Sequence, residues 1–292
     1  LTQRGPLIPL LLELSMGVLV LDRLTTAAIL FTVATGLMIV LGVMKLINFA
    51  HGAFLTLGGY SAYVMTVVGW SPWMAIPFAA TVGLFFGLLI EYFIVRPLYS
   101  RPLDAILATW GLGIIIGQLI TIGFGREVQF VEPPVSGAIE FLDQSYSIYR
   151  LIFVGVAAAI GAGLTVLLYF TRFGLNARAV IMNENLARGL GIDSTRVRLA
   201  TFGLGAALAS MAGALITPLI SVDPNLGLPW LVNSFMLVLA SGVSIPGLAI
   251  VSVLLGGAQV LVSTYISPII GGLTIVVLAA VILRIRPQGI GR

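Results

Sequence analysis

The sequence predicts an all-α membrane protein that crosses the bilayer in eight to ten segments, some of them short or broken. Hydrophobic residues make up 59% of the 292 residues and charged residues only 9%, whereas soluble domains carry about 25% charge. The mean hydropathy is +1.11, and long apolar runs alternate with short Arg-rich stretches. Because such runs are long enough to span hydrocarbon as helices, we expect one transmembrane domain over residues 1–292.

Composition argues against several other classes of protein. The chain has no cysteine and a single histidine, His51, which excludes disulfides, thiolate sites, cysteine nucleophiles and multi-histidine metal centres. The formal charge of +4 lies in loops rather than in a stripe interleaved with aromatics, so nucleic-acid binding is a poor interpretation. No Gly-x-x-x-x-Gly-Lys-Ser/Thr loop occurs. We therefore expect no ATP hydrolysis by this chain, no catalytic residue, no metal and no cofactor.

The first half of the chain is a series of apolar segments. Pro6–Leu21 is short and carries Glu13, so it fits either a tilted span or an in-plane amphipathic helix. No small-residue cleavage site precedes Asp22, so we expect no signal peptide. Four predicted spans follow, the second of them shorter than the others: Leu24–Met44, Ala53–Val68, Trp73–Val95 and Asp104–Phe124.

The second half contains interrupted helices. Two full spans come first, and three further apolar pieces follow, of which two are too short to cross as straight helices: Arg150–Phe170, Leu199–Ile220, Pro229–Leu239, Leu248–Ile266 and Gly272–Ile285. The last three are separated by Ser241–Gly247 and Ser267–Gly272. Broken helices at membrane depth are tolerated where they line a cavity or a water-filled path.

The chain shows a faint internal echo between two of its interruptions. Asn48–Gly52 precedes a segment that carries Gly58 and Gly59, and Ser244–Gly247 precedes one that carries Gly256 and Gly257. An internal duplication, which is common in transporters, explains this pattern. Chance similarity between glycine-rich membrane segments explains it as well, and both explanations stay open.

Three basic clusters predict the orientation of the chain. Arginines collect at residues 96–101, 172–198 and 284–292, and short basic loops of this kind stay on the cytoplasmic side. The loop at residues 125–149 has an acidic excess and is expected outside. Because the alternation of spans agrees with all three clusters, we expect a multi-pass protein of the inner (plasma) membrane with its C-terminus in the cytoplasm.

The basic loop at residues 172–198 is predicted to be folded. Asn183 can cap a short helix Glu184–Leu190, the glycines near its end can terminate it, and Asp193 or Ser194 can cap the next helix. A short cytoplasmic helix between two spans is a surface that a transporter could offer to a soluble motor. An ordinary basic loop that only orients the chain is the other explanation.

One dense polar group lies near membrane depth. Asn48 and His51 are spaced i, i+3, so they would share one face of a helix, and Gly52 allows the backbone to bend. Both a polar path and a helix break satisfied by its own side chains fit this pattern. The other polar residues inside predicted spans are interpreted as structural partners of neighbouring helices: Glu91, Gln118 and Gln259.

Four stretches resemble the integral membrane permease subunits of branched-chain amino acid ABC importers, in particular the LivH type. Gly42–Tyr60 reads GVMKLINFAHGAFLTLGGY and is similar to the signature of these permeases. Glu91–Pro102 resembles their Glu-Arg-x-x-Tyr-Arg-Pro segment, and Arg286–Gly289 their C-terminal end. The fourth stretch resembles their cytoplasmic loop at Arg178-Ala179, Glu184, Ala187, Gly191-Ile192, Arg196-Val197 and Phe202.

The resemblance implies a subunit of an importer that works by alternating access. Its expected partners are a homologous permease (a paralogue or a second copy), two ATPase subunits and an extracytoplasmic substrate-binding protein. Leu24–Leu30 and Ala240–Pro246 depart from the pattern of the family, so the substrate stays open among branched-chain amino acids, urea and amides. The alternatives are a stand-alone secondary transporter or channel, which would need more buried acids than this chain has, and a passive scaffold.

Two sets of candidate residues follow. We expect a translocation path or gate where the two interruptions face one another, at Asn48, His51, Gly52, Gly58, Ser241, Ser244 and Gly247. The resemblance implies ATPase coupling at the folded loop, at Arg178, Asn183, Glu184, Ala187, Gly191 and Ile192.

Overall fold

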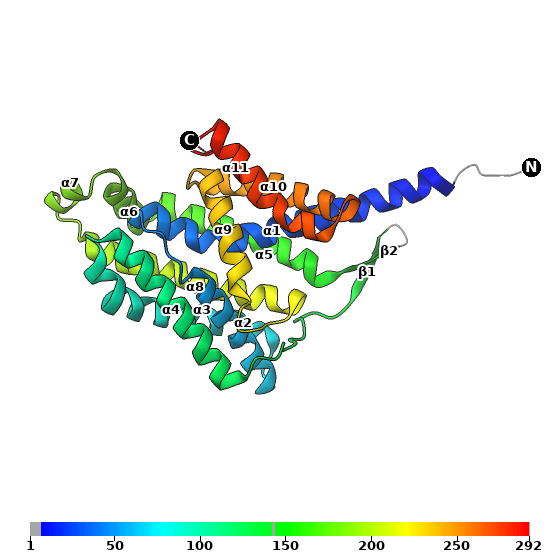
Figure 1. The fold of residues 1–292 in the computed structure, drawn as a ribbon, viewed down its shortest axis with the longest axis horizontal. Coiled ribbons are helices and arrows are strands. Elements are labelled where there is room, and N and C mark those ends of the chain that lie inside the picture. Colours follow the sequence, from blue (N-terminus) through cyan, green and yellow to red (C-terminus); the bar gives the residue numbers. More distant parts are fainter. Residues whose placement is uncertain (1–6, 142–143, 292) are drawn as a thin grey trace, which may run out of the picture.

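Helices make up most of the chain in the computed structural model, which describes residues 7–141 and 144–291 (Figure 1). The helices are α1 (Leu7–Met44), α2 (His51–Val67), α3 (Ala75–Ile90), α4 (Pro102–Phe124), α5 (Ile148–Phe170), α6 (Arg172–Met182), α7 (Glu184–Gly189), α8 (Ser194–Ile220), α9 (Gly227–Ser241), α10 (Ile245–Tyr265) and α11 (Pro268–Ile285). A small antiparallel hairpin joins β1 (Ala138–Phe141) to β2 (Gln144–Ser147), with Ala138 opposite Ser147.

The predicted all-α membrane fold is confirmed. Seven helical segments in the described part of the chain are long and apolar enough to span a bilayer. One of them, at residues 72–98, combines α3 with two 3₁₀ turns, η1 (Pro72–Met74) and η3 (Arg96–Leu98), and a π-helix, η2 (Glu91–Val95). The expected eight to ten segments are reached when the shorter helices α2 and α9 are counted with these seven.

Residues 7–21 and Leu24–Met44, which the sequence presents as two segments, form one unbroken helix, α1. Asp22 lies inside this helix and has a distant partner. Its carboxylate lies 2.9 Å from the guanidinium of Arg150, at the start of α5. A paired charge near the end of a span does not require the helix to stop, and the side chains before Gly17 lie outside the described residues.

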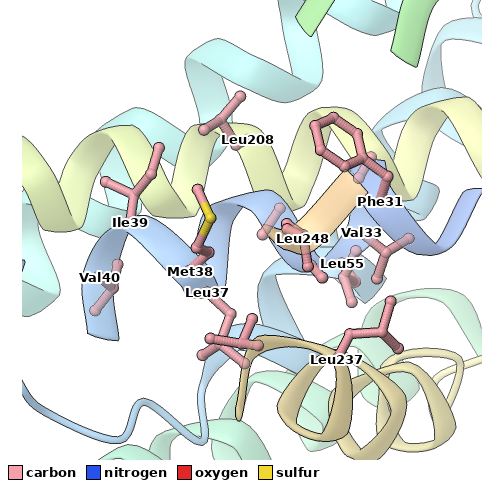
Figure 2. Close-up of a cluster of buried hydrophobic side chains, with 14 of the residues drawn as sticks. Phe31, Val33, Leu37, Met38, Ile39, Val40, Leu55, Leu208, Leu237 and Leu248 are labelled. Atoms are coloured by element: carbon pink, nitrogen blue, oxygen red, sulfur yellow. The ribbon is translucent and has the colours of Figure 1, made fainter. Parts of the chain in front are cut away.

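The core forms around α1 and α8. In their most apolar stretches these two helices are 83% and 72% buried, whereas the other five long spans are at most 33% buried. Figure 2 shows side chains from several helices meeting in this core, among them Leu37 on α1, Leu55 on α2, Leu208 on α8, Leu237 on α9 and Leu248 on α10. The outer spans therefore keep most of their apolar surface for lipid or for partner subunits.

Glycine permits the neighbours of α8 to approach its backbone. A Cβ on Gly58 of α2 would overlap the backbone of Ser210, and one on Gly213 would overlap the carbonyl of Leu55. The same holds for Gly36 of α1 against the carbonyl of Gly205. Small residues at such crossings let membrane helices pack closely, which compensates for the absence of a hydrophobic driving force in lipid.

The three basic clusters lie at one end of the bundle, which we call the basic end. The guanidinium of Arg198 lies 4.5 Å from the ring of Tyr99, joining the second cluster to the first. The C-terminal residues around Gly289 pack on the turn between α9 and α10, and that turn and Arg178 of α6 line one pocket. The β1–β2 hairpin lies at the opposite end, the hairpin end (Figure 1).

We expect Gly58→Val to destabilise the protein, because the new side chain would force α2 away from α8. Overpacking of this kind costs about 1–3 kcal/mol of unfolding free energy. The matched control is Gly111→Val on α4, where no atom lies within 4 Å of the new Cβ. Thermal unfolding in detergent should show a lower melting temperature for Gly58→Val than for the control, and equal melting temperatures would contradict this packing.

Candidate functional site

The first interruption enters the bundle as a non-helical segment at residues 45–50, between α1 and α2. Its backbone groups find side-chain partners. The amide oxygen of Asn48 accepts a hydrogen bond from the N–H of Ala50 at 3.0 Å, and the hydroxyl of Thr109 on α4 accepts one from Phe49 at 3.2 Å. Because unpaired backbone groups are costly in lipid, these two side chains make an irregular segment tolerable at this depth.

His51 holds the start of α2 against α1. Its Nε2 lies 2.9 Å from the carbonyl oxygen of Val33, and the side chain is buried. A Cβ on Gly36 would lie only 3.2 Å from the imidazole, so the ring fills the space beside that glycine. Asn48 thus pairs with the backbone of the helix break itself, whereas His51 pairs with a carbonyl of α1. Both interpretations of this polar group stay open.

A groove opens beside this interruption, between α2, α4 and α9. Its volume is about 140 Å³, and Gly52 is the one residue of the predicted path set that lines it. The ring of Phe49 forms part of the wall, with the rings of Trp110 and Phe235 each 5.4 Å away. With this volume, the groove is smaller than the pockets of roughly 300 Å³ and more that hold drug-sized ligands.

None of the described residues that line the groove is charged. Its polar members are Thr56, Gln118, Thr121 and Asn225. The two threonine hydroxyls donate to carbonyls of their own helices, and Thr56 also accepts from the N–H of Gly227 at 3.0 Å. The amides of Gln118 and Asn225 are thus the polar groups best placed to meet a solute in an otherwise apolar groove.

The second interruption receives the C-terminal residues. The N–H of Ile290 donates to Ala240 at 2.9 Å and that of Gly291 to Ser241 at 3.1 Å. Gly242 and Gly289 both have positive φ, and a Cβ on Gly289 would overlap the N–H of Gly242. Ser241 and its neighbours therefore form a packing surface, which we call the cradle, for residues 289–291, which are far away in sequence.

Ser244 and Gly247 belong to the same cradle. The hydroxyl of Ser244 caps α10 by accepting from the N–H of Gly247 at 3.1 Å, and both residues lie against Gly291. Gly58, a further residue of the predicted path set, packs against the backbone of α8.

The two interruptions do not face one another within this chain. Gly52 lies against Gly227 and Leu231, at the first turns of α9, and Ser241 is the last residue of that helix. Fourteen helical steps separate the two ends of α9, or roughly 20 Å at about 1.5 Å per residue. The suggested duplication and the path role of the predicted residues stay predictions.

The basic loop is folded as predicted. The side chain of Asn183 accepts from the N–H of Leu186 at 3.0 Å and caps α7, and Asp193 caps α8 through Thr195 and Arg196. Gly191, with a φ of +87°, ends α7. The N–H of Ile192 then donates to Ala187 and that of Gly191 to Arg188, both at 3.0 Å, which is the Schellman pattern.

The predicted coupling residues differ in their burial and in their partners. Ala187 is buried with Val43, Val180 and Val197, so it packs inside this chain. Glu184 forms an ion pair with Arg188 at 2.9 Å and another with Arg198. The guanidinium of Arg178 lies 5.2 Å from the ring of Tyr169.

Three large apolar side chains of the loop are exposed. Met182, Leu186 and Leu190 are 86%, 62% and 74% exposed. Sequence reasoning missed these three residues, although the spacing of four between Leu186 and Leu190 places those two on one side of a helix. Met182 ends α6, and the extended residue Asn183 separates it from α7.

The chain matches one protein family over nearly its whole length. The matching family is described as the permease component of branched-chain amino acid transport systems, and the match covers residues 19–285. The chain belongs to this family. Family membership favours the transport-subunit interpretation over the stand-alone transporter, and it fits a chain that has a transport role and no catalytic one.

Several relatives within or near the family are similar along most of their length. The chain is 28% identical to the high-affinity branched-chain amino acid permease LivH of Escherichia coli, covering 88% of this chain and 89% of that one. It is 27% identical to the probable LivH of Methanocaldococcus jannaschii (90% and 88%) and 28% identical to BraD of Pseudomonas aeruginosa (92% and 93%).

A solved structure shares the fold of this permease family member. PsaBC from Streptococcus pneumoniae, in complex with a Fab, is 15% identical, with a TM-score of 0.52 and coverage of 95% of this chain and 97% of that one. This likeness concerns the arrangement of helices alone.

Sequence analysis of this permease also missed α4 as a wall of the groove. The groove-lining residues of α4 recur every three or four positions: Trp110, Gly113, Ile114, Gly117, Gln118 and Thr121. That spacing defines one helix face, and its glycines, glutamine and threonine contrast with the apolar remainder of α4. A stripe of small and polar residues on an apolar span was thus the available signal.

Proposed function

We propose that this chain is the permease subunit of an ATP-binding-cassette importer that moves a branched-chain amino acid, or a related small solute such as urea or an amide, inward. The observation that carries the proposal is the small neutral groove between α2, α4 and α9, in a chain of the permease family. Apolar walls suit an aliphatic side chain, and the amides of Gln118 and Asn225 suit a polar head.

The absence of charge from the groove lining supports weak contact with the solute along the path. A permease that bound a zwitterion tightly would need an ionic partner, and it would release its solute slowly. Affinity then belongs to an extracytoplasmic binding protein, and direction is imposed by two ATPase subunits. In this chain the groove needs only to admit the solute and to let it leave.

A homologous permease, either a paralogue or a second copy, is the proposed partner across α4. This helix is only 17% buried in its most apolar stretch, and its outer face carries Leu103, Leu107 and Ile122, which are 70–82% exposed. The groove lies on the flank of the same helix, so a second permease packed there would close it into a path. Alternating access would then follow from rocking of one permease against the other.

The ATPase subunits are proposed to dock on α7 and its flanking residues. Leu186 and Leu190, together with Met182 at the end of α6, are the exposed apolar side chains there, and the caps at Asn183 and Gly191 hold α7 in shape. The buried Ala187 anchors α7 on its own chain. A rigid helix with an apolar outer face is suited to a groove on a soluble partner.

Orientation follows from the gathering of all three basic clusters at the basic end. Because basic residues are retained on the cytoplasmic side, the basic end and the C-terminus are proposed to lie in the cytoplasm. The hairpin end is then extracytoplasmic, where a binding protein can reach it, and the membrane is the inner (plasma) membrane.

Filling the groove should stop uptake without unfolding the protein. A Cβ on Gly117 would have its nearest neighbour at 3.8 Å, so Gly117→Leu can place its side chain in the groove. Gly123→Leu is the matched control on the same helix, because Gly123 faces open space. Uptake of labelled leucine by the reconstituted importer should fall to background for Gly117→Leu and stay normal for the control. Normal uptake by an assembled Gly117→Leu complex would place the path elsewhere.

Cysteine labelling should report opposite sides for the two ends of the bundle. The chain has no cysteine of its own, so Asn185→Cys on α7 and Ser136→Cys before β1 would each be unique, and both positions are exposed. An impermeant maleimide added to intact cells should label Ser136→Cys only, and it should label Asn185→Cys after the cells are opened. Labelling of both variants in intact cells would refute the orientation.

An acidic substitution on the exposed face of α7 should weaken ATPase docking. The side chain of Leu186 is 62% exposed in this chain. Leu186→Asp removes its apolar contact with the ATPase subunits and should weaken their binding by about 2 kcal/mol, as expected for an interface hot spot. Asn185→Asp adds the same charge one position away and serves as the control. Co-purification of the ATPase subunits should decrease for the first variant only. Equal retention by both would argue that docking uses another surface.

A further inference from the structure

A continuous row of side-chain contacts runs from α7 into the bundle. Glu184, the first residue of α7, pairs with Arg198 on α8. The guanidinium carbon of Arg198 lies 4.5 Å from the centre of the Tyr99 ring, a cation–π contact. The hydroxyl of Tyr99 donates a hydrogen bond to the carboxylate of Glu91. Four residues from separate elements are thereby linked.

Burial distinguishes this row from the other ion pairs at the basic end. The side chain of Arg198 is 16% exposed, against 86% for Arg196 in its pair with Asp193, and Glu91 is fully buried. Exposed pairs contribute little to stability because water and salt screen them. A shielded pair holds its partners more firmly, since removal of one partner leaves the other charge buried and uncompensated.

The inner end of the row lies at a junction that matters to the groove. Glu91 is the first residue of the π-helix η2, where α3 stops being α-helical, and π-helical turns inside helices are frequently found at functional sites. Tyr99 lies three residues before α4 begins at Pro102. Further along α4, the face from Trp110 to Thr121 forms one wall of the groove.

We propose that Glu184, Arg198, Tyr99 and Glu91 form a latch that ties α7 to the junction between the α3 span and α4. A displacement of α7 by the ATPase subunits is passed through Arg198 and Tyr99 to the start of α4, and so to the groove wall. Arg198 and Tyr99 are positioning residues in this scheme. The inference rests on the proposed function, in which α7 receives the ATPase subunits.

The structure supplies a contrast within the same cluster. Glu184 also pairs with Arg188, at 2.9 Å, one turn along α7 itself. Arg188 is 55% exposed, and its other hydrogen bond goes to Ser194, the first residue of α8, so this second pair joins α7 to α8 without including Tyr99. Loss of Arg188 therefore removes one contact between α7 and the start of α8 but leaves the contacts of Arg198 with Glu184 and Tyr99 in place.

The test compares variants of the complete importer in proteoliposomes, with labelled leucine as the probe. Tyr99→Phe removes only the hydroxyl, Arg198→Gln removes the charge, and Arg188→Gln is the matched control. The number of ATP molecules hydrolysed per leucine taken up should rise at least about fivefold for the first two, the lower end of coupling between distant sites. It should stay at the wild-type value for Arg188→Gln.

Two further variants separate coupling from mere stability. Glu91→Gln keeps an oxygen that accepts from Tyr99 and should retain the wild-type ratio, whereas Glu91→Leu should raise it. If Arg198→Gln fails to assemble, Tyr99→Phe decides the matter. Unchanged ratios in Tyr99→Phe and Glu91→Leu would overturn the latch, as would an equal rise in Arg188→Gln. Failure of the wild-type complex to take up leucine with ATP would instead count against the proposed function.

Discussion

The close approach of neighbouring backbones to α8 is the constraint on which the rest of this structure depends. Gly205 and Gly213 of α8 allow carbonyl groups of α1 and α2 to approach the backbone of α8 closely. Gly58 of α2 and Gly83 of α3 allow the same close approach around Ser210. The hydroxyl of Ser210 completes the arrangement by donating to the carbonyl of Phe54 at 2.9 Å. With apolar lipid outside, contact of this kind is what selects one packing of apolar helices over another.

The irregular segments follow from a second rule of the bilayer, that backbone polar groups must find partners inside the protein. Each interruption obeys it with a different device. The segment at residues 45–50 uses the side chains of Asn48 and Thr109, whereas the turn after α9 uses the C-terminal backbone at Ile290 and Gly291. An interruption is thus no proof of a path. The first lies beside the groove between α2, α4 and α9, whereas the second lines the pocket that it shares with Arg178.

Local chemistry made part of this fold predictable. Apolar runs and arginine clusters are read from neighbouring residues, and the caps at Asn183 and Asp193 depend only on the next few N–H groups. For the same reason the folded loop and the gathering of the basic clusters agree with expectation.

The missed features depend on partners that are distant in sequence. The ion pair of Asp22, inside α1, is with Arg150, which is 128 residues away. Ala187 was expected to contact a partner subunit, and it is buried because Val43 and Val197 happen to face it. The cradle for Gly289 is likewise a tertiary contact. The residue types of a short amphipathic helix do not show which of its side chains pack on the rest of the chain and which face outward.

The distribution of tight and loose packing indicates where this permease can move. Helices joined through backbone contacts at glycine cannot slide past one another, since every step would bring a side chain against a carbonyl. We therefore expect α1, α2, α3 and α8 to move as one body. The span of α4 is only 17% buried in its most apolar stretch, so it is the wall of the groove that is free to shift. Because α4 begins just after Tyr99, the movable wall and the fixed body meet at a place that the side chains of Tyr99, Arg198 and Glu184 connect to α7. A movement of α7 driven by the ATPase subunits would therefore shift the loosely packed α4 relative to the rigid body of α1, α2, α3 and α8. Such a shift is what opening and closing the groove requires.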